Sequence, residues 1–226
     1  MTERSRAPGG EIDQASFEFV HDKDASEDSE WSTRWNRVTP LGALDIRQLQ
    51  QRVVSCDRCH LRSTCTQVVF GEGKTDAKIM FIGEAPGAQE DQEGRPFVGR
   101  SGKLLDKILE ACELSREDVY ITNIVKCRPP ENRTPKPEER DYCMSYLRAQ
   151  VQLIKPDVIV TLGAAATQGL IDPRARITRM RGRWQEWNGV KVMPTFHPAA
   201  LLRDPRKKKP VWDDIQKVLD MVKGEN

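Results

Sequence analysis

At 226 residues the chain is long enough to bury a full hydrophobic core, and 31% of its residues are charged. It has no apolar run long enough to span a membrane and no signal-like start, so we expect a soluble cytoplasmic protein without membrane contact. The net charge of +2 hides five Lys/Arg and nine Asp/Glu within residues 1–40, so the rest of the chain carries +6, which fits a polyanionic partner.

The first 40 residues differ in composition from the rest of the chain. They are rich in Ser, Asp, Glu and Arg, lack a helical or strand period, and predict a disordered acidic arm. Trp31 and Trp35 lie four residues apart and could dock one helical turn on the body of the protein or on a partner, and we favour the body. We expect residues 41–226 to form a single domain.

Four apolar runs alternate with helical patterns along that domain. Apolar residues recur every three or four positions from Leu41 and predict a helix that ends near Cys56. Further helices are expected at 101–113, from Pro137 onward, at 164–170 and at 210–222, and strands at 78–82, 119–125, 157–162 and 190–196. This alternation predicts an α/β fold, a three-layer sandwich with a central four-stranded parallel sheet flanked by helices.

Polar residues follow the predicted strands where each strand ends. Glu84, Asn123, Gly163 and His197 occupy these positions, and Phe97 lies in a glycine-rich loop after the first strand. Each alone is commonly a turn or capping residue. Because parallel strands present their carboxyl ends on one edge, their coincidence indicates a ligand site there.

Six cysteines occur in a chain without an export signal, which favours metal or core roles over disulfides. Cys56 and Cys59 form a Cys-x2-Cys pair, and Cys127 and Cys143 complete a possible four-sulfur site for zinc or an iron–sulfur cluster, with no metal as the third alternative. Cys65 could replace one of the four by spacing. Cys112 falls on the apolar face of a predicted helix and is expected in the core.

Five ordered stretches resemble the iron–sulfur, or family 4, uracil-DNA glycosylases. They are VFGEG at 69–73, GEAPG at 83–87, GRPFVG at 94–99, TNIVKCRPP at 122–130 and TFHPAALLR at 195–203. The resemblance covers about residues 50 to 222 and implies a monomeric, nucleoid-associated enzyme with the uracil-DNA glycosylase fold. It would flip uracil out of single- or double-stranded DNA and excise it, leaving an abasic site, in base excision repair of deaminated cytosine.

The resemblance also assigns roles to residues. Glu84 and His197 would be catalytic, Glu84 toward the attacking water or the cationic sugar and His197 toward uracil O2. The four thiols of Cys56, Cys59, Cys127 and Cys143 would bind a structural [4Fe-4S] cluster. Phe97 would stack on the flipped base and Asn123 would match its N3–H and O4 edge. The other uracil-binding positions are Gly83, Ala85, Gly87, Ala88, Glu90 and Asn132.

Contacts with DNA are expected after His197. Arg203, Lys207 and Lys208 would bind phosphates, and Leu201 or Leu202 would fill the gap left by the flipped base, with Leu201 the assigned wedge. The arginine-rich stretch 174–183 would line either the DNA or the cluster.

Three other functions fit parts of the sequence. A uracil-DNA binder without turnover is disfavoured because residues 98–105 carry no inserted basic loop with a histidine. A nucleic-acid-binding zinc module would explain the cysteines but not the polar residues at the strand ends. A glycosylase of wider base range is compatible with the sequence.

Overall fold

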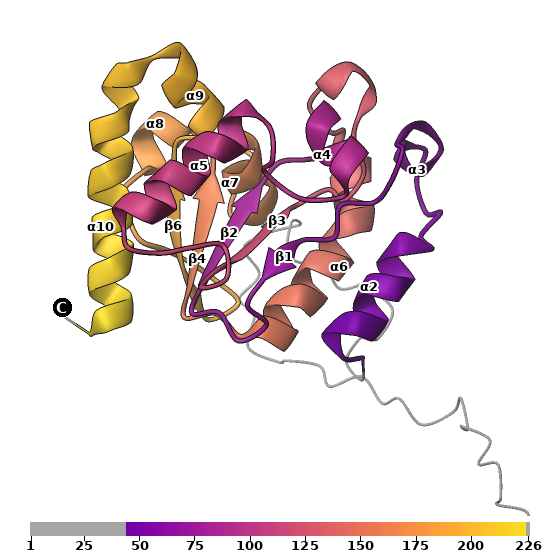
Figure 1. Ribbon diagram of the computed structural model, residues 1–226, viewed down its shortest axis with the longest axis horizontal. Helices are drawn as coiled ribbons and strands as arrows, with labels where there is room; N and C mark the ends of the chain where they lie inside the picture. Colours follow the sequence, from indigo (N-terminus) through magenta and orange to yellow (C-terminus); the bar gives the residue numbers. More distant parts are fainter. Residues whose placement is uncertain (1–43, 225–226) are drawn as a thin grey trace, which may run out of the picture.

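The computed structural model of the chain describes residues 44–224 (Figure 1). The predictions made for the acidic arm and for Trp31 and Trp35 lie outside these residues. Within the described part, no helix is both long and apolar enough to cross a bilayer.

A six-stranded sheet forms the centre, in the order β1-β3-β2-β4-β6-β5. Its four inner strands are parallel, which confirms the predicted parallel sheet: β2 (Ile79–Gly83), β3 (Tyr120–Asn123), β4 (Val158–Leu162) and β6 (Val190–Thr195). Two short antiparallel edge strands, β1 (Glu72–Gly73) and β5 (Gln185–Trp187), extend it and were not predicted. The β5–β6 hairpin turns at Asn188-Gly189, both with positive φ, so this Asn-Gly pair was a usable signal for it.

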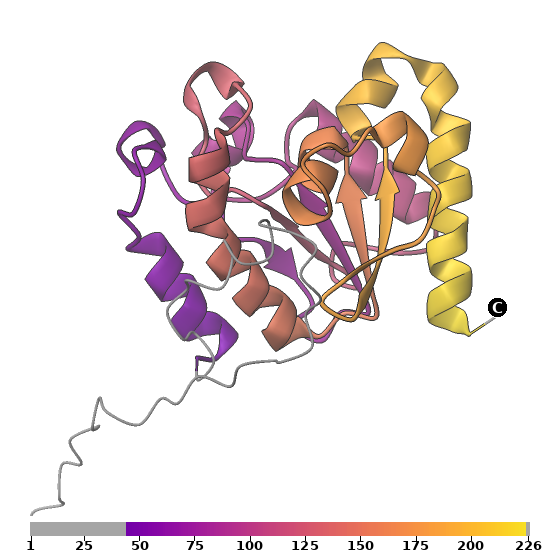
Figure 2. The same cartoon turned by 180° about the vertical axis from the view of Figure 1, so that it is seen from behind.

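Helices cover both faces of the sheet (Figures 1 and 2). The core of one face includes α5 (Arg100–Ala111) and α10 (Lys208–Lys223), and the core of the other includes α6 (Pro137–Ile154) and α7 (Ala164–Leu170). The first described helix, α2 (Ile46–Val54), packs on α6 and begins at a capping box formed by Asp45 and Gln48. Shorter helices are α3 (Leu61–Thr64), α4 (Ala88–Glu93), α8 (Ile177–Met180) and α9 (Pro198–Arg203).

Strand β2 shows why the sheet needs both layers. All five of its residues are buried, with Ile79 and Phe81 in the core that contains α5 and α10, and Met80 and Ile82 in the core that contains α6 and α7. Such a continuous apolar run is typical of a parallel strand covered on both faces. The order of the parallel strands changes direction between β2 and β4, and ligand crevices open at such a point, outside the carboxyl ends of the strands.

Candidate functional site

A cavity of about 910 Å³ opens at the carboxyl ends of the parallel strands. The residues that line it come from the loops after β2, β3, β4 and β6, as the parallel topology predicts. The predicted site residues among them are Glu84, Ala85, Gly87, Glu90, Phe97, Asn123, Asn132, Gly163, His197, Arg203 and Lys207. Gly83, Ala88, Leu201 and Lys208 do not line it.

Asn123, the last residue of β3, provides a polar group inside the cavity. Its side chain is 2% exposed, and its Oδ1 has no hydrogen-bond partner although it is fully buried. Because buried polar atoms are almost always hydrogen-bonded, an unpaired acceptor on the wall of a cavity indicates that a ligand donates to it.

Gly83 creates the space for this arrangement without lining the cavity itself. A Cβ at Gly83 would lie 2.3 Å from Asn123 Oδ1 and 2.5 Å from Phe97 Cζ. Only glycine therefore allows the asparagine and the aromatic ring to approach the end of β2 together.

Phe97 has an unusual backbone. Its φ is +53°, in the left-handed region that a bulky residue rarely adopts. The ring is 4% exposed and lies 5.6 Å from the ring of His197, centroid to centroid, at 30° between planes. Two aromatic faces are therefore held together at the cavity by a strained loop.

Glu90 holds this loop from one side. One carboxylate oxygen accepts hydrogen bonds from the backbone N–H of Val98 (2.9 Å) and Gly99 (2.8 Å), and the other accepts from Gly87 N–H (3.1 Å). Both oxygens are thus engaged by backbone groups. Glu90 joins the start of α4 to the Phe97 loop, a role that sequence spacing alone did not reveal.

His197 is a neutral hydrogen-bond donor. Burial and, to a smaller extent, the charge of Arg203 lower the pKa of His197 to about 4. Its Nδ1 accepts a hydrogen bond from Ala199 N–H at 3.1 Å, which caps α9. The proton of the neutral ring therefore resides on Nε2.

Two other polar side chains that line the cavity are those of Glu84 and Asn132. Burial raises the pKa of Glu84, partly offset by a hydrogen bond with Thr134 and the charge of Arg140. The Oδ1 of Asn132 accepts a hydrogen bond from Arg128 Nε at 2.8 Å.

Of the three basic residues predicted to bind phosphates, two line the cavity. Arg203 is exposed and Lys207 is half-buried, with its Nζ 5.5 Å from the centroid of the Phe196 ring, and both line the cavity. Lys208 is exposed outside the lining. Thr178 and Ile177 from α8 complete this wall, so the arginine-rich stretch 174–183 borders this cavity and not the cysteines.

The assignment of Leu201 as the wedge is wrong. Leu201 is 2% exposed and packs in the core that contains α5 and α10, so it has no surface to insert between bases. Leu202, the alternative, is 44% exposed.

The four predicted ligand cysteines converge elsewhere. Cys56, Cys59, Cys127 and Cys143 all line one small cavity, whereas Cys65 does not. All six cysteines are free thiols, and Cys112 packs against the core beside α5 as predicted. Within residues 44–224, no group of three His, Cys, Asp or Glu side chains is placed to hold a single metal ion.

The buried lysine of this second cavity links it to the first. Lys126 is 1% exposed and lines the cysteine cavity. Its Nζ donates to Thr122 Oγ1 (2.6 Å), Asn123 O (2.7 Å) and Gln150 Oε1 (2.6 Å). These three neutral acceptors match the three donors of an ammonium group.

Comparison with known proteins agrees with this geometry. A family model described as the uracil DNA glycosylase superfamily matches residues 70–216, so the chain belongs to that superfamily. A type-4 uracil-DNA glycosylase of Thermotoga maritima is 49% identical over 78% of this chain and 94% of its own length, and one of Archaeoglobus fulgidus is 46% identical over 76% and 91%. A type-5 uracil-DNA glycosylase of Pyrobaculum aerophilum is 32% identical over 72% of this chain and 85% of its own length. These identities place the chain in the type-4 group and confirm the resemblance.

Proposed function

We propose that the protein is a monofunctional DNA glycosylase that binds a flipped uracil in the 910 Å³ cavity and hydrolyses its N-glycosidic bond. The product would be an abasic site, and the biological role repair of deaminated cytosine. The observation that carries this proposal is the unpaired, buried Oδ1 of Asn123 beside the ring of Phe97.

Recognition of the base follows from those two side chains. The amide of Asn123 offers one acceptor and one donor group, which complement N3–H and O4 of uracil and mismatch cytosine. A buried acceptor without a partner costs about 1–3 kcal/mol, and the N3–H of the bound base removes that cost. Phe97 provides the stacking face.

Bond cleavage places negative charge on uracil O2 and positive charge on the sugar. The neutral His197, with its proton on Nε2, is suited to donate a hydrogen bond to O2. Each hydrogen bond to a charged group contributes about 1.5–3 kcal/mol, which is roughly tenfold to a hundredfold in rate. Free backbone N–H groups in the loop of residues 84–88 would assist, Pro86 having none and Gly87 already donating to Glu90, and Glu84 would hold the water or stabilise the cationic sugar.

DNA would enter along the side of the cavity that carries the basic residues. Arg203, Lys207 and Lys208 would contact phosphates, and Leu202 would occupy the gap left by the flipped base. We expect the protein to act as a monomer on single- or double-stranded DNA.

The cysteine cavity fits a structural [4Fe-4S] cluster. Four thiols from three separate segments surround it, and the buried side chain of Lys126 lines the same cavity. When bound, the cluster would supply a cross-link between the end of α2, the loop after β3 and α6. It would take no part in bond cleavage.

The decisive experiment is a uracil-release assay with purified protein. Single- and double-stranded oligonucleotides with one uracil should yield free uracil and an alkali-labile abasic site, whereas thymine at the same position should not react. Tight binding without release would indicate a binder without turnover. Release of hypoxanthine from a matched substrate would indicate the wider base range.

Iron analysis tests the cluster separately. The protein should contain about four irons per chain and absorb in the visible range. Cys143→Ser should lose the iron, whereas Cys112→Ser, a half-buried thiol in a different core, should keep it. Loss of iron in Cys65→Ser would show that the assigned four ligands are wrong.

A further inference from the structure

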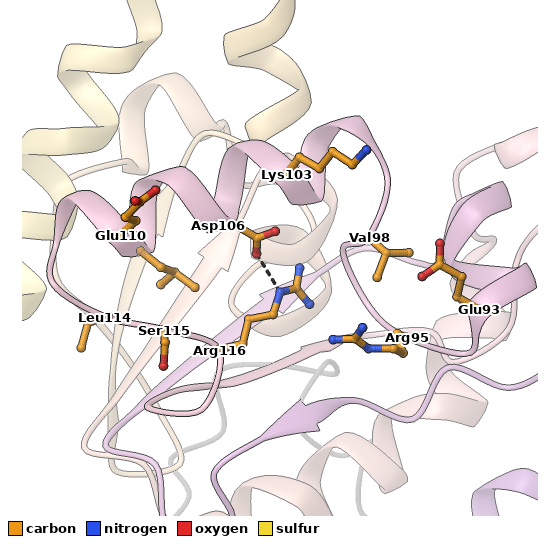
Figure 3. Close-up of a pocket in the computed structure, with 10 residues that line it drawn as sticks. Glu93, Arg95, Val98, Lys103, Asp106, Glu110, Leu114, Ser115 and Arg116 are labelled. Atoms are coloured by element: carbon orange, nitrogen blue, oxygen red, sulfur yellow. Dashed lines mark hydrogen bonds and ion pairs between the residues drawn. The ribbon is translucent and has the colours of Figure 1, made fainter.

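Arg116 forms ion pairs and also donates hydrogen bonds to backbone carbonyls of the Phe97 loop. It lies between α5 and β3, and its side chain is 18% exposed. Its guanidinium donates to the backbone carbonyls of Pro96 (2.8 Å) and Phe97, and forms ion pairs with Glu72 (2.5 Å) and Asp106 (2.7 Å). Figure 3 shows Arg116 pointing from its own loop toward Asp106 on α5.

These contacts complete a two-sided hold on Phe97. The carbonyl groups of residues 96 and 97 are bound by Arg116, and the next two N–H groups by Glu90. The backbone of α5 also packs directly against Phe97, because a Cβ on Gly102 would lie only 1.7 Å from Phe97 O. A non-glycine residue in the left-handed region persists only when its surroundings determine it to this degree.

Arg116 acts from outside the uracil cavity. It lines a separate groove of about 630 Å³ with Arg95, Val98 and Asp106 (Figure 3), and none of the described residues lines both hollows. Neighbouring residues of one loop therefore face different hollows, Phe97 the cavity and Val98 the groove. Arg116 cannot touch a base in the cavity and can influence it only through Phe97.

We propose that Arg116 is a positioning residue that holds Phe97 in its left-handed conformation and thereby sets the affinity for the flipped base. This inference rests on the proposed function. It assigns a role in base binding to a residue from outside the cavity, and it predicts that losing the arginine changes uracil affinity more than the chemical step.

Arg95 provides a matched control. It also pairs with Glu72, at 2.7 Å, and lines the same groove, but its side chain is 56% exposed and no hydrogen bond joins it to the carbonyls of residues 96 and 97. Removing Arg95 therefore disturbs the same ion-pair network but leaves the hydrogen bonds from Arg116 to the carbonyls of residues 96 and 97 in place.

The experiment compares Arg116→Met, Arg116→Lys and Arg95→Met in steady-state excision of uracil, with free uracil as the inhibitor. Arg116→Met should raise KM and the inhibition constant of uracil about tenfold, as expected if one strained residue is no longer held, with a smaller change in kcat. Arg116→Lys keeps the charge but cannot span both carbonyls and both carboxylates, so its inhibition constant should also rise. Arg95→Met should stay within about twofold of the wild type.

Hydrogen exchange of residues 95–99 gives a second readout that does not need activity. Exchange there should accelerate in both Arg116 variants and not in Arg95→Met, while α6 keeps its protection in all of them. Unchanged uracil inhibition in the Arg116 variants, or an equal shift in Arg95→Met, would overturn the proposal. If the wild type neither releases nor binds uracil, the proposed function fails, and the exchange comparison alone decides whether Arg116 holds the loop.

Discussion

The cavity at the carboxyl ends of the strands has two walls that differ in exposure. The buried wall consists of Glu90, Phe97 and Asn123, which are between 2% and 8% exposed, with Gly83 behind them. The exposed wall follows His197 and includes Arg203 and Lys207, and Leu202, which is 44% exposed, lies next to Arg203 on α9 outside the lining. A wall that excludes water can distinguish one base from another by unpaired hydrogen-bonding groups, whereas an exposed basic wall can bind any phosphate backbone.

Asn123→Ala should give the largest effect, because it removes both hydrogen bonds to the base edge. We expect kcat/KM on a uracil oligonucleotide to fall about a hundredfold to a thousandfold. The free energy of unfolding should change by only about 1 kcal/mol, since Oδ1 has no partner to lose in the free protein. The loss should be equal in single- and double-stranded DNA and independent of salt. A salt-dependent loss would show that the buried wall also binds the backbone.

His197 lies between the two walls, and the pH dependence of folding stability tests whether its imidazole ring is buried and neutral. Its pKa is about 4 in the folded protein, below the ordinary value of about 6.5 expected after unfolding. Between these values the unfolded chain binds more protons, so stability is lost as the pH falls from about 6.5 to about 4, by roughly 3 kcal/mol. Denaturant unfolding of the wild type and His197→Gln should diverge over this range, with the shallower pH dependence in the variant. Parallel curves would contradict the buried, neutral imidazole.

Gly83→Ala tests whether the buried wall tolerates any added atom. The new Cβ would press on Asn123 Oδ1 and Phe97 Cζ, so we expect kcat/KM to fall about tenfold to a hundredfold and stability to fall by about 1–3 kcal/mol. Gly189→Ala is the control for activity, because its Cβ meets no atom within 4 Å; its φ of +78° makes the alanine cost about 1 kcal/mol of stability, but kcat/KM should stay that of the wild type. Full activity in Gly83→Ala would mean that the loop can shift away from β2 without consequence.

The residues at the strand ends could be predicted from the sequence, whereas the residues that hold the Phe97 loop could not. The positions of Asn123 and His197 followed from apolar runs, because parallel strands bring their carboxyl ends together. Glu90 and Arg116 could not be assigned their roles, since their partners lie in loops or far along the chain, such as Glu72 and Phe97. Local periodicity contains no signal for such contacts.

The choice between Leu201 and Leu202 failed for a related reason. Helix α9 has only six residues, too few for the helical period to show which of two adjacent leucines faces the core. The two edge strands were missed because runs of two and three residues carry no alternation. The parallel centre, with longer buried runs, was predicted correctly.

Leu202→Ala probes the exposed apolar side chain that precedes Arg203 on α9. If this side chain fills the gap left by the flipped base, activity should fall about tenfold on double-stranded DNA and little on single-stranded DNA, where no stack has to be restored. Leu201→Ala is the matched control and should instead lower stability by about 2–5 kcal/mol through a core cavity. Equal losses on both substrates would remove the wedge role from Leu202.

Arg203→Ala should have the smallest effect, because one phosphate contact is shared among several basic residues. We expect affinity for DNA to fall a few-fold, equally for uracil and thymine oligonucleotides, and the slope of log affinity against log salt to decrease by about 1. Arg206→Ala provides the comparison, since Arg206 is more than nine-tenths exposed but paired with Asp204 at 2.9 Å. Its ion pair already neutralises it, so its salt slope should remain that of the wild type. A loss in Arg203→Ala that is confined to uracil-containing DNA would mean that the exposed wall takes part in base recognition, and the division between the two walls would then no longer hold.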